Sequence, residues 1–279
     1  MPDLTPGVAS ALSPLVRRIV APNPGPFTGP GTNTYLVGID EVAVIDPGPD
    51  IEEHIDAIVG ASMQERVRWV VLTHTHPDHY PGTQRLVEKT GAEVLAYGKK
   101  IDKDAQIVPD RVIGEGDTIE GTEFGLEVLH TPGHAPNHLC FLLEEERVLF
   151  TGDNVLEGMF SVINPARGGD MAVYLDTLAR LEKLRLSRLC PGHGDVIDEP
   201  RARIQEYAAH RLDRERQVLK VLKAGPARVS DLVDTLYGDQ ELHPKLVEAA
   251  GWQMHAHLVK LKADGKVTGT SVKSAWQLA

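Results

Sequence analysis

The 279-residue sequence is short of cysteine, of aromatic residues and of long apolar runs. Two cysteines are too few for the disulfide framework of a small secreted domain. No run approaches the ~18 consecutive apolar residues that a membrane-spanning helix needs. The first residues do not combine a basic segment with an apolar one, so we expect no secretory signal, no membrane partner and, by default, a cytoplasmic location.

The two cysteines, Cys140 and Cys190, each lie near a candidate metal ligand in the sequence. This position permits a role in metal binding. The alternative is a small apolar residue buried on a strand, which is the usual environment of a free cysteine. We favour the buried interpretation.

The net charge of −11 is unevenly distributed along the chain. Residues 201–279 contain 13 Lys and Arg against 9 Asp and Glu, whereas the remaining residues contain 16 against 31. A uniformly acidic protein would not attract nucleic acid. The C-terminal part therefore forms either a surface for an anionic ligand or an ordinary solvated basic helix.

Apolar patterns in the first 200 residues predict strands alternating with helices. The predicted strands cover residues 34–39, 42–45, 67–72, 93–97, 126–130, 138–143, 148–150 and 186–189. Helices are predicted at 51–58, with Asp50 as N-cap, at 82–89, and at 171–184, with Asp170 as N-cap. His54 is expected to be a structural residue at the edge of the first helix.

The pattern changes after Pro200. Helices are predicted at 201–223, at 231–237 with Ser230 as N-cap, and at 244–261, followed by a hairpin over 265–269 and 274–278. Three helices and a hairpin in this order are typical of a winged-helix module. We therefore predict a catalytic domain at 1–200 and a winged-helix-like domain at 201–279.

Seven residues that can bind a metal ion lie directly after predicted strands. Four of them are crowded into six positions, and three follow later strands: His74, His76, Asp78 and His79, then His134, Asp153 and His193. Alternate residues of an extended segment point the same way, so His74 and His76 can share an ion. Seven ligands are too many for one tetrahedral ion and suit two ions that share a carboxylate. A structural zinc site is disfavoured because the set contains no cysteine.

These motifs resemble those of the metallo-β-lactamase superfamily, in the same order, over roughly residues 15–200. The resemblance implies an α/β (α+β) fold, a four-layer αββα sandwich, with two Zn2+ ions at one edge; Mn2+ or Fe2+ could replace zinc. It implies that one ion is held by His74, His76 and His134, and the other by Asp78, His79 and His193, with Asp153 between them. Asp46 would support the site from behind, or would simply be a turn residue.

Differences among the members of the superfamily argue against several functional classes for this chain. Flavo-diiron proteins carry Glu in place of His76, which argues against an iron redox site. True β-lactamases lack an aspartate at the position of Asp153. Only 39 residues separate Asp153 from His193, which leaves no room for the inserted domain of the large RNA-processing nucleases.

Two classes remain. Glyoxalase II, a thioesterase, shares all seven ligands, but its glutathione-binding residues have no match here. The lactamase-B-like protein 2 family is more similar, because it also has the segments matching Gly31–Val37 and Gly152–Asn154 and a winged-helix-like C-terminal domain. This resemblance implies an endoribonuclease that cuts single-stranded RNA; hydrolysis of a glutathione thioester or another small ester is the alternative. A non-catalytic regulator that binds DNA through its winged helix is a third hypothesis.

The expected mechanism is attack by a hydroxide held between the two ions on phosphorus or on a thioester carbonyl. Asp78 and Asp153 would hold and orient this hydroxide. His138, four residues after His134, is either a proton donor to the leaving group or a structural residue at the start of a strand. Asn154 either lines the site or stabilises a turn, and we favour the turn. The predicted partner is thus an anionic or small-molecule substrate. Single-stranded RNA is one such substrate.

Overall fold

The structure is a computed structural model that describes residues 4–98 and 107–279. Contacts between Cα atoms divide the chain into two compact units. The first comprises the residues up to Thr131 together with Asn137–Phe160 and Arg185–Pro200, and the second comprises Pro132–Pro136, Ser161–Leu184 and Arg201–Ala279. The predicted division at residue 200 differs from these units in two segments and stays a prediction.

The first unit contains two sheets. The larger has seven described strands in sequence order: β1 (Ser10–Ala11), β2 (Val16–Val20), β3 (Asn33–Val37), β4 (Glu41–Ile45), β5 (Arg66–Val71), β6 (Glu93–Tyr97) and β7 (Arg111–Ile113). Strands β1 to β4 pair antiparallel, whereas β4 to β7 pair parallel. The parallel part needs crossover connections, and α1 (Glu52–Ala61) and α2 (Thr83–Thr90) supply two of them.

The smaller sheet has five described strands. They are β8 (Thr118–Glu120), β9 (Gly125–His130), β10 (Leu139–Leu143), β11 (Val148–Gly152) and β12 (Arg188–Pro191), in the order β12-β11-β10-β9-β8. Only β11 and β12 are parallel. The predicted strands therefore all form.

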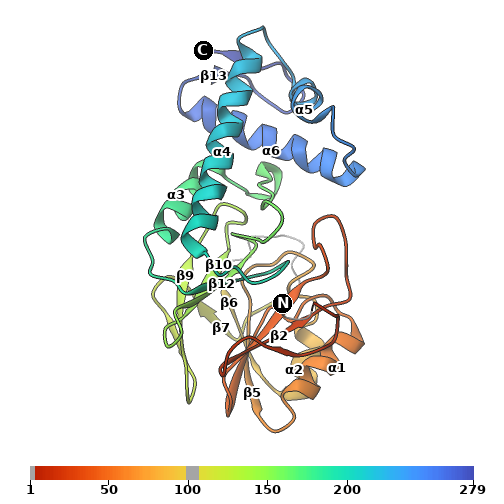
Figure 1. Cartoon of the computed structure of the whole chain (residues 1–279), viewed down its shortest axis with the longest axis vertical. Helices are drawn as coiled ribbons and strands as arrows, with labels where there is room; N and C mark the ends of the chain where they lie inside the picture. The colour runs from red at the N-terminus through yellow and green to blue at the C-terminus, as the bar shows by residue number, and fades with distance from the viewer. Residues whose placement is uncertain (1–3, 99–106) are drawn as a thin grey trace. The chain divides into compact units, whose positions relative to one another are not determined.

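The core of this unit lies between the two sheets. Val37 and Trp69 of the larger sheet and Phe141 and Phe150 of the smaller one belong to one buried cluster. The other face of the larger sheet is covered by α1 and α2, which lie side by side (Figure 1). Residues 42–45 of β4 and 69–71 of β5 are buried on both faces, and both segments are accordingly apolar without interruption.

Two predicted helix caps are wrong. The first helix begins after Ile51, and Asp50 instead forms an exposed ion pair with Arg85 at 2.7 Å. Ser230 lies inside α5, where the carboxylate of Asp231 accepts the Arg228 backbone N–H. Asp170 does cap its helix, since its side chain accepts the N–H groups of the first turn.

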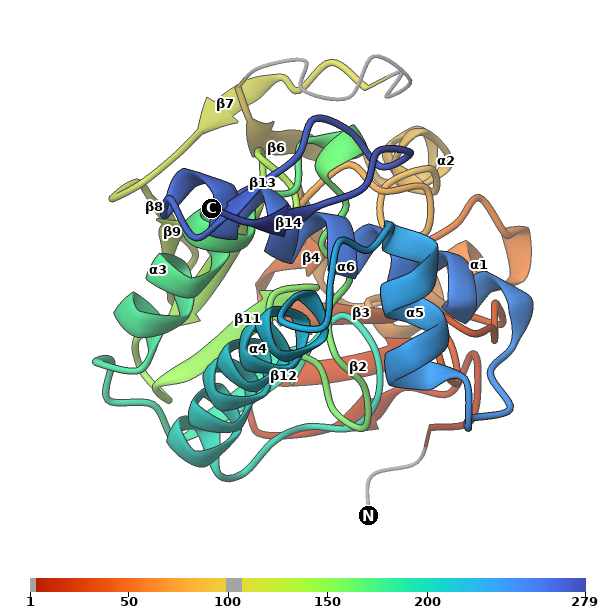
Figure 2. The same cartoon turned by 90° about the horizontal axis from the view of Figure 1, so that it is seen from above.

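The second unit is mainly helical. Its elements are η1 (Pro165–Arg167), α3 (Met171–Leu181), α4 (Pro200–Leu222), α5 (Val229–Tyr237), α6 (Pro244–Ala263), β13 (Val267–Thr268) and β14 (Gln277–Leu278). The N-terminal half of α4 lies beside α3, as both views show (Figures 1 and 2). The Arg211 guanidinium of α4 lies over the Tyr174 ring of α3. The C-terminal half contributes Val218 and Leu222 to the core of α5, α6 and the hairpin. One long helix thus belongs to both parts of this unit.

No helix in the described part of the chain is long and apolar enough to cross a membrane.

Candidate metal centre

The predicted ligands follow the ends of four strands. His74 to His79 come after β5, His134 after β9, Asp153 after β11 and His193 after β12. Two groups of their ligand atoms are close enough to hold a metal ion, with every atom of a group within 4.8 Å of the others. We call them the His134 cluster (His74, His76, His134 and Asp153) and the His193 cluster (Asp78, His79 and His193).

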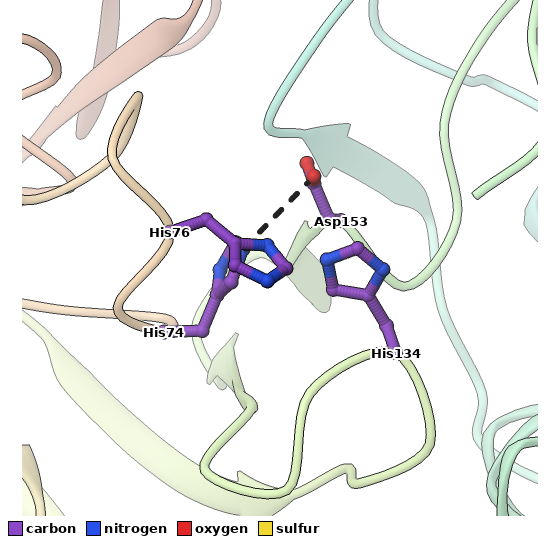
Figure 3. A group of neighbouring side chains, drawn as sticks. All are labelled: His74, His76, His134 and Asp153. Carbon is purple, nitrogen blue, oxygen red and sulfur yellow. Dashed lines mark hydrogen bonds and ion pairs between the residues drawn. The ribbon is translucent and has the colours of Figure 1, made fainter. Parts of the chain in front are cut away.

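In the His134 cluster, side chains from separate loops point toward one another (Figure 3). The Nε2 atom of His74 lies 2.8 Å from Nδ1 of His76 and 4.0 Å from an Oδ atom of Asp153. Two nitrogen ligands of a tetrahedral zinc ion, each ~2.0 Å from it, are ~3.3 Å apart by geometry. The arrangement is therefore close to a ligand set for one ion.

In the His193 cluster, two imidazoles face two carboxylates. His193 Nε2 lies 3.2 Å from Asp78 Oδ2 and 3.3 Å from Asp153 Oδ1. His79 Nε2 lies 3.6 Å and 3.4 Å from the same two oxygens. Asp153 therefore faces both clusters, one oxygen toward each, as a shared carboxylate requires.

The electrostatics of the His193 cluster favour a cation. Burial opposes charge on His79 and His193, but the neighbouring carboxylates outweigh it and raise the pKa of both rings. Burial likewise opposes ionisation of Asp78, but His79 and His193 lower its pKa to about 2. Without metal, protons supply the positive charge that the carboxylates attract. A metal ion would displace these protons on binding.

The ring nitrogens of the His193 cluster show whether the residues fit a metal ion. The Nε2 atoms of His79 and His193 are buried and make no hydrogen bond with the described residues. Buried polar atoms normally have a partner, and these two point at carboxylates in a cluster with ligand spacing. A metal ion would satisfy both atoms, so the residues fit a metal.

Asp46 fixes the orientation of two ligands from behind. Its Oδ2 atom accepts the Nδ1–H of His79 at 2.8 Å, so Nε2 is the nitrogen that gives up its proton when a metal ion binds. The same carboxylate accepts the backbone N–H and the hydroxyl of Thr73 at 2.8 and 2.6 Å. The Thr73 oxygen in turn accepts Nδ1–H of His74 at 3.0 Å. Asp46 has φ of 51°, a conformation that Asp and Asn tolerate better than most residues.

Backbone carbonyls orient two more rings. The Nδ1–H of His193 donates to the Gly31 carbonyl at 3.2 Å. The Nδ1–H of His134 donates to the Val162 carbonyl at 2.7 Å, and the Ser161 hydroxyl lies 3.1 Å away. In both rings Nε2 is left to face the cluster.

Two glycines of the motifs make room for the ligands. A Cβ at Gly192 would lie 2.9 Å from Asp153 Oδ1, and one at Gly152 would lie 2.8 Å from Nε2 of His138. Gly152 also has a positive φ of 46°. A larger residue at Gly192 would displace the ligands Asp153 and His79, and one at Gly152 would displace His138 and Thr73, which support the ligands.

His138 and Asn154 are both buried, and their hydrogen bonds do not favour a direct role in the reaction. His138 Nε2 accepts the backbone N–H of Asp153 at 3.1 Å, and its Nδ1 lies 2.8 Å from the Thr131 hydroxyl. Of the two predicted alternatives for His138, proton donor or structural residue, these contacts are those of a structural residue. The Asn154 side chain donates to the Thr131 carbonyl at 2.9 Å and joins two ligand loops.

Other predicted residues are placed in the core. His54 is buried against Thr34, with 2.9 Å between its Nε2 and the Thr34 hydroxyl oxygen. Both cysteines are buried, and burial raises the pKa of Cys190 to about 12, which makes thiolate ligation unfavourable. The buried interpretation of the cysteines fits these contacts.

The supporting residues Thr73, Gly31, Ser161 and Val162 were not predicted. Thr73 does carry a signal, since a hydroxyl between a buried strand and a ligand histidine can reach that ring. Gly31 and Val162 act through backbone carbonyls, which any residue provides, so their side chains give no signal.

The fold, the ligand loops and the two clusters define a class: a metallo-hydrolase with a dinuclear histidine and aspartate site. Residues 27–193 match the Metallo-beta-lactamase superfamily, and residues 229–276 match the Beta-lactamase associated winged helix domain. The chain belongs to the metallo-beta-lactamase superfamily.

Relatives are similar over nearly the whole chain. "Beta-lactamase-like protein 2 homolog" of Caenorhabditis elegans is 35% identical over 263 residues, covering 92% of this chain and 87% of the relative. "Atrochrysone carboxyl ACP thioesterase" of Aspergillus chevalieri is 35% identical over 270 residues, covering 92% and 83%. The predicted resemblance to the lactamase-B-like protein 2 family is thus confirmed.

Solved structures confirm the fold. A beta-lactamase domain protein from Burkholderia ambifaria superposes with a TM-score of 0.85 at 22% identity, covering 100% of this chain and 95% of that one. A metallo-beta-lactamase family protein from Thermus thermophilus gives 0.79 at 25% identity, covering 96% and 100%. The predicted fold class, with its C-terminal winged helix, is correct, and the chain is a metal-dependent hydrolase of the superfamily.

Proposed function

We propose that this hydrolase cleaves thioesters, releasing a carboxylic acid and a thiol. The observation that carries the proposal is the similarity to an acyl carrier protein thioesterase over 92% of this chain, which spans the metal ligands and the C-terminal helices alike. This choice reverses the order of the sequence-based expectation, which placed single-stranded RNA before a thioester. Neither of the two relatives described above carries the name of a ribonuclease.

The leaving group of a thioester suits the site. A thiol with a pKa of ~8.5 departs as a thiolate without receiving a proton in the same step. An alcohol released from a phosphodiester has a pKa nearer the ~15.7 of water and needs a proton donor or a cation. The one predicted proton donor, His138, already uses Nε2 to accept the backbone N–H of Asp153.

When bound, two metal ions would polarise the carbonyl and provide hydroxide at neutral pH. His74, His76 and His134 would hold one ion and His79 and His193 the other, because a ring nitrogen of each residue faces its cluster. Asp78 would help His79 and His193 to hold their ion, and Asp153 would be the carboxylate that faces both clusters. Asp46 and Thr73 hold the rings in the required tautomer.

The test compares substrates under one set of conditions. The zinc-loaded chain is mixed with an acyl N-acetylcysteamine thioester, a glutathione thioester or end-labelled single-stranded RNA, each with and without a chelator. We expect thioester cleavage that the chelator abolishes and that Asp78→Asn reduces by at least about 100-fold, since a metal ion contributes several kcal/mol to such a reaction. Chelator-sensitive RNA cleavage without turnover of either thioester would overturn the proposal.

A further inference from the structure

The C-terminal helices α4 and α6 hold the loop that orients His134. We propose that Arg211 and Gln253 are positioning residues that set the affinity of the His134 cluster for its metal ion. His134, the loop Ser161–Ile163 and both helices belong to the same compact unit. The proposal concerns metal binding and stands whichever bond the enzyme cuts.

Gln253 on α6 makes two hydrogen bonds with the loop Ser161–Ile163. Its amide nitrogen donates to the Ser161 carbonyl at 2.9 Å, and its amide oxygen accepts the Ile163 N–H at 3.3 Å. One side chain therefore satisfies the peptide groups on both sides of Val162. The orientation of the amide is fixed by chemistry, because a carbonyl must meet the NH2 group and an N–H must meet the oxygen.

Arg211 on α4 approaches the same carbonyl. Its guanidinium donates to the Ser161 carbonyl, and its side chain is only 1% exposed. The rings of Tyr174 and Tyr207 lie 5.5 and 5.8 Å from the guanidinium carbon, within the range of cation–π interactions. A buried cation held this firmly fixes the carbonyl that it contacts.

The loop then fixes the metal ligand. With the peptide groups around Val162 held in place, the Val162 carbonyl points at Nδ1 of His134 and accepts its proton at 2.7 Å. The bond selects the tautomer with a proton on Nδ1 and aims Nε2 at the cluster. The His193 cluster has its own supports, Asp46 and Gly31, and takes no part in this chain of contacts.

The arrangement gives the C-terminal region a function in the metal site. A winged helix is usually discussed as a surface for DNA or for another protein. Here α6 carries Gln253 on its buried side, and this residue is only 9% exposed. Its polar side chain is therefore placed for the loop and not for a partner in solution.

Replacing Gln253 tests the proposal. Gln253→Met keeps the length of the side chain and removes both hydrogen bonds. Metal affinities are measured by competition with a chromophoric chelator, and the environment of the ion by the visible absorption of the cobalt-substituted protein. We expect the ion of the His134 cluster to bind about 10–100-fold more weakly, with an altered cobalt spectrum, while the other ion keeps its affinity.

Matched variants separate positioning from general stability. Gln205→Met removes an exposed glutamine of α4 whose amide donates to Glu182, and it should keep both affinities and the cobalt spectrum. Arg211→Lys keeps the charge and one donor, so its loss of affinity should be smaller than that of Gln253→Met. If either Gln253→Met or Arg211→Lys fails to fold, the other decides. Wild-type affinities and spectrum with a lowered unfolding temperature of the metal-free chain would overturn the proposal.

Discussion

The two metal clusters are supported in different ways. In the His193 cluster, His79 is held by the carboxylate of Asp46, which lies at the end of β4, and His193 by the carbonyl of Gly31. In the His134 cluster, His134 is held by a carbonyl of a long loop that itself depends on α4 and α6. The supports of the first cluster lie next to strands β3 and β4 of the larger sheet, whereas that of the second depends on helices far away in the sequence. We therefore expect His134 to be more sensitive than His79 and His193 to substitutions in the C-terminal helices.

Asp153 is the residue through which the two clusters become one site, so its loss should have the largest effect. Asp153→Asn removes the charge that faces both clusters. We expect both ions to be lost and kcat/KM for the thioester to fall by at least about three orders of magnitude, because metal ions supply several kcal/mol of transition-state stabilisation. Elemental analysis of the purified chain and steady-state kinetics measure the two effects.

The matched control is Asp176→Asn on the exposed side of α3, which should change neither metal content nor turnover. If Asp153→Asn loses one ion and keeps the other, Asp153 belongs to a single cluster. The interpretation of a shared carboxylate would then be wrong.

A substitution at Asp46 should weaken metal binding in one cluster more than in the other. In Asp46→Asn one oxygen is replaced by an NH2 group, which cannot accept the protons of His79 or Thr73. We expect the ion of the His193 cluster to bind about 10–100-fold more weakly. The ion held by His134 should be affected less, since only His74 depends on Asp46, and then through Thr73.

Asparagine is the right substitution here because it also tolerates the positive φ of this position. Competition with a chelator gives both affinities, and Asp46→Ala shows what the added backbone strain contributes. Equal weakening of both ions in Asp46→Asn would mean that the clusters do not have separate supports.

The structure brings the predicted ligand residues together, and the signal that points to them in the sequence is local. His74 to His79 lie within one short segment, and a ligand after each of the strands β9, β11 and β12 needs only the strand and its turn to be located. The strands were found because burial on one or both faces leaves a strong apolar pattern. The fold followed from the same patterns together with the motifs.

The supports were not predicted because they are not local. Gln253 and Ile163 are 90 residues apart, and no periodicity links an amide on one helix to a loop so far away. The predictions of Asp50 and Ser230 as helix caps were wrong for a different reason. Asp50 has the right residue type, but the ion pair with Arg85 and the extended backbone at Ile51 moved the helix start by a residue.

Two buried histidines show what the carboxylates of the site do. His79, surrounded by Asp78, Asp153 and Asp46, has a raised pKa, whereas burial lowers the pKa of His54 to about 4. His54 uses Nε2 toward the Thr34 hydroxyl, and its buried Nδ1 makes no hydrogen bond with the described residues. Protonation of His54 would place an uncompensated charge in the interior.

The low pKa of His54 predicts that the stability of the fold depends on pH. Metal binding should change least of all in this experiment. The folded-state pKa of His54 lies below its unfolded value of 6.5, so the unfolded chain binds the proton more tightly. Its contribution to stability is therefore fully present above pH 6.5 and is lost as the pH falls toward about 4. Between pH 7 and pH 5 this loss amounts to about 2 kcal/mol.

Replacement of the ring isolates this contribution. His54→Gln removes the titrating group and keeps an N–H that can reach Thr34, so the free energy of unfolding should fall less between pH 7 and pH 5 than in the wild type, by about 2 kcal/mol. Urea unfolding of the metal-free chain at the two pH values measures the difference. His243→Gln, which changes an exposed histidine, should keep the wild-type fall, and both variants should keep their metal affinities. If the free energy of unfolding falls as much in His54→Gln as in the wild type, other groups cause the pH dependence. The proposed difference between His54, buried without a carboxylate, and His79, buried beside three, would then be wrong.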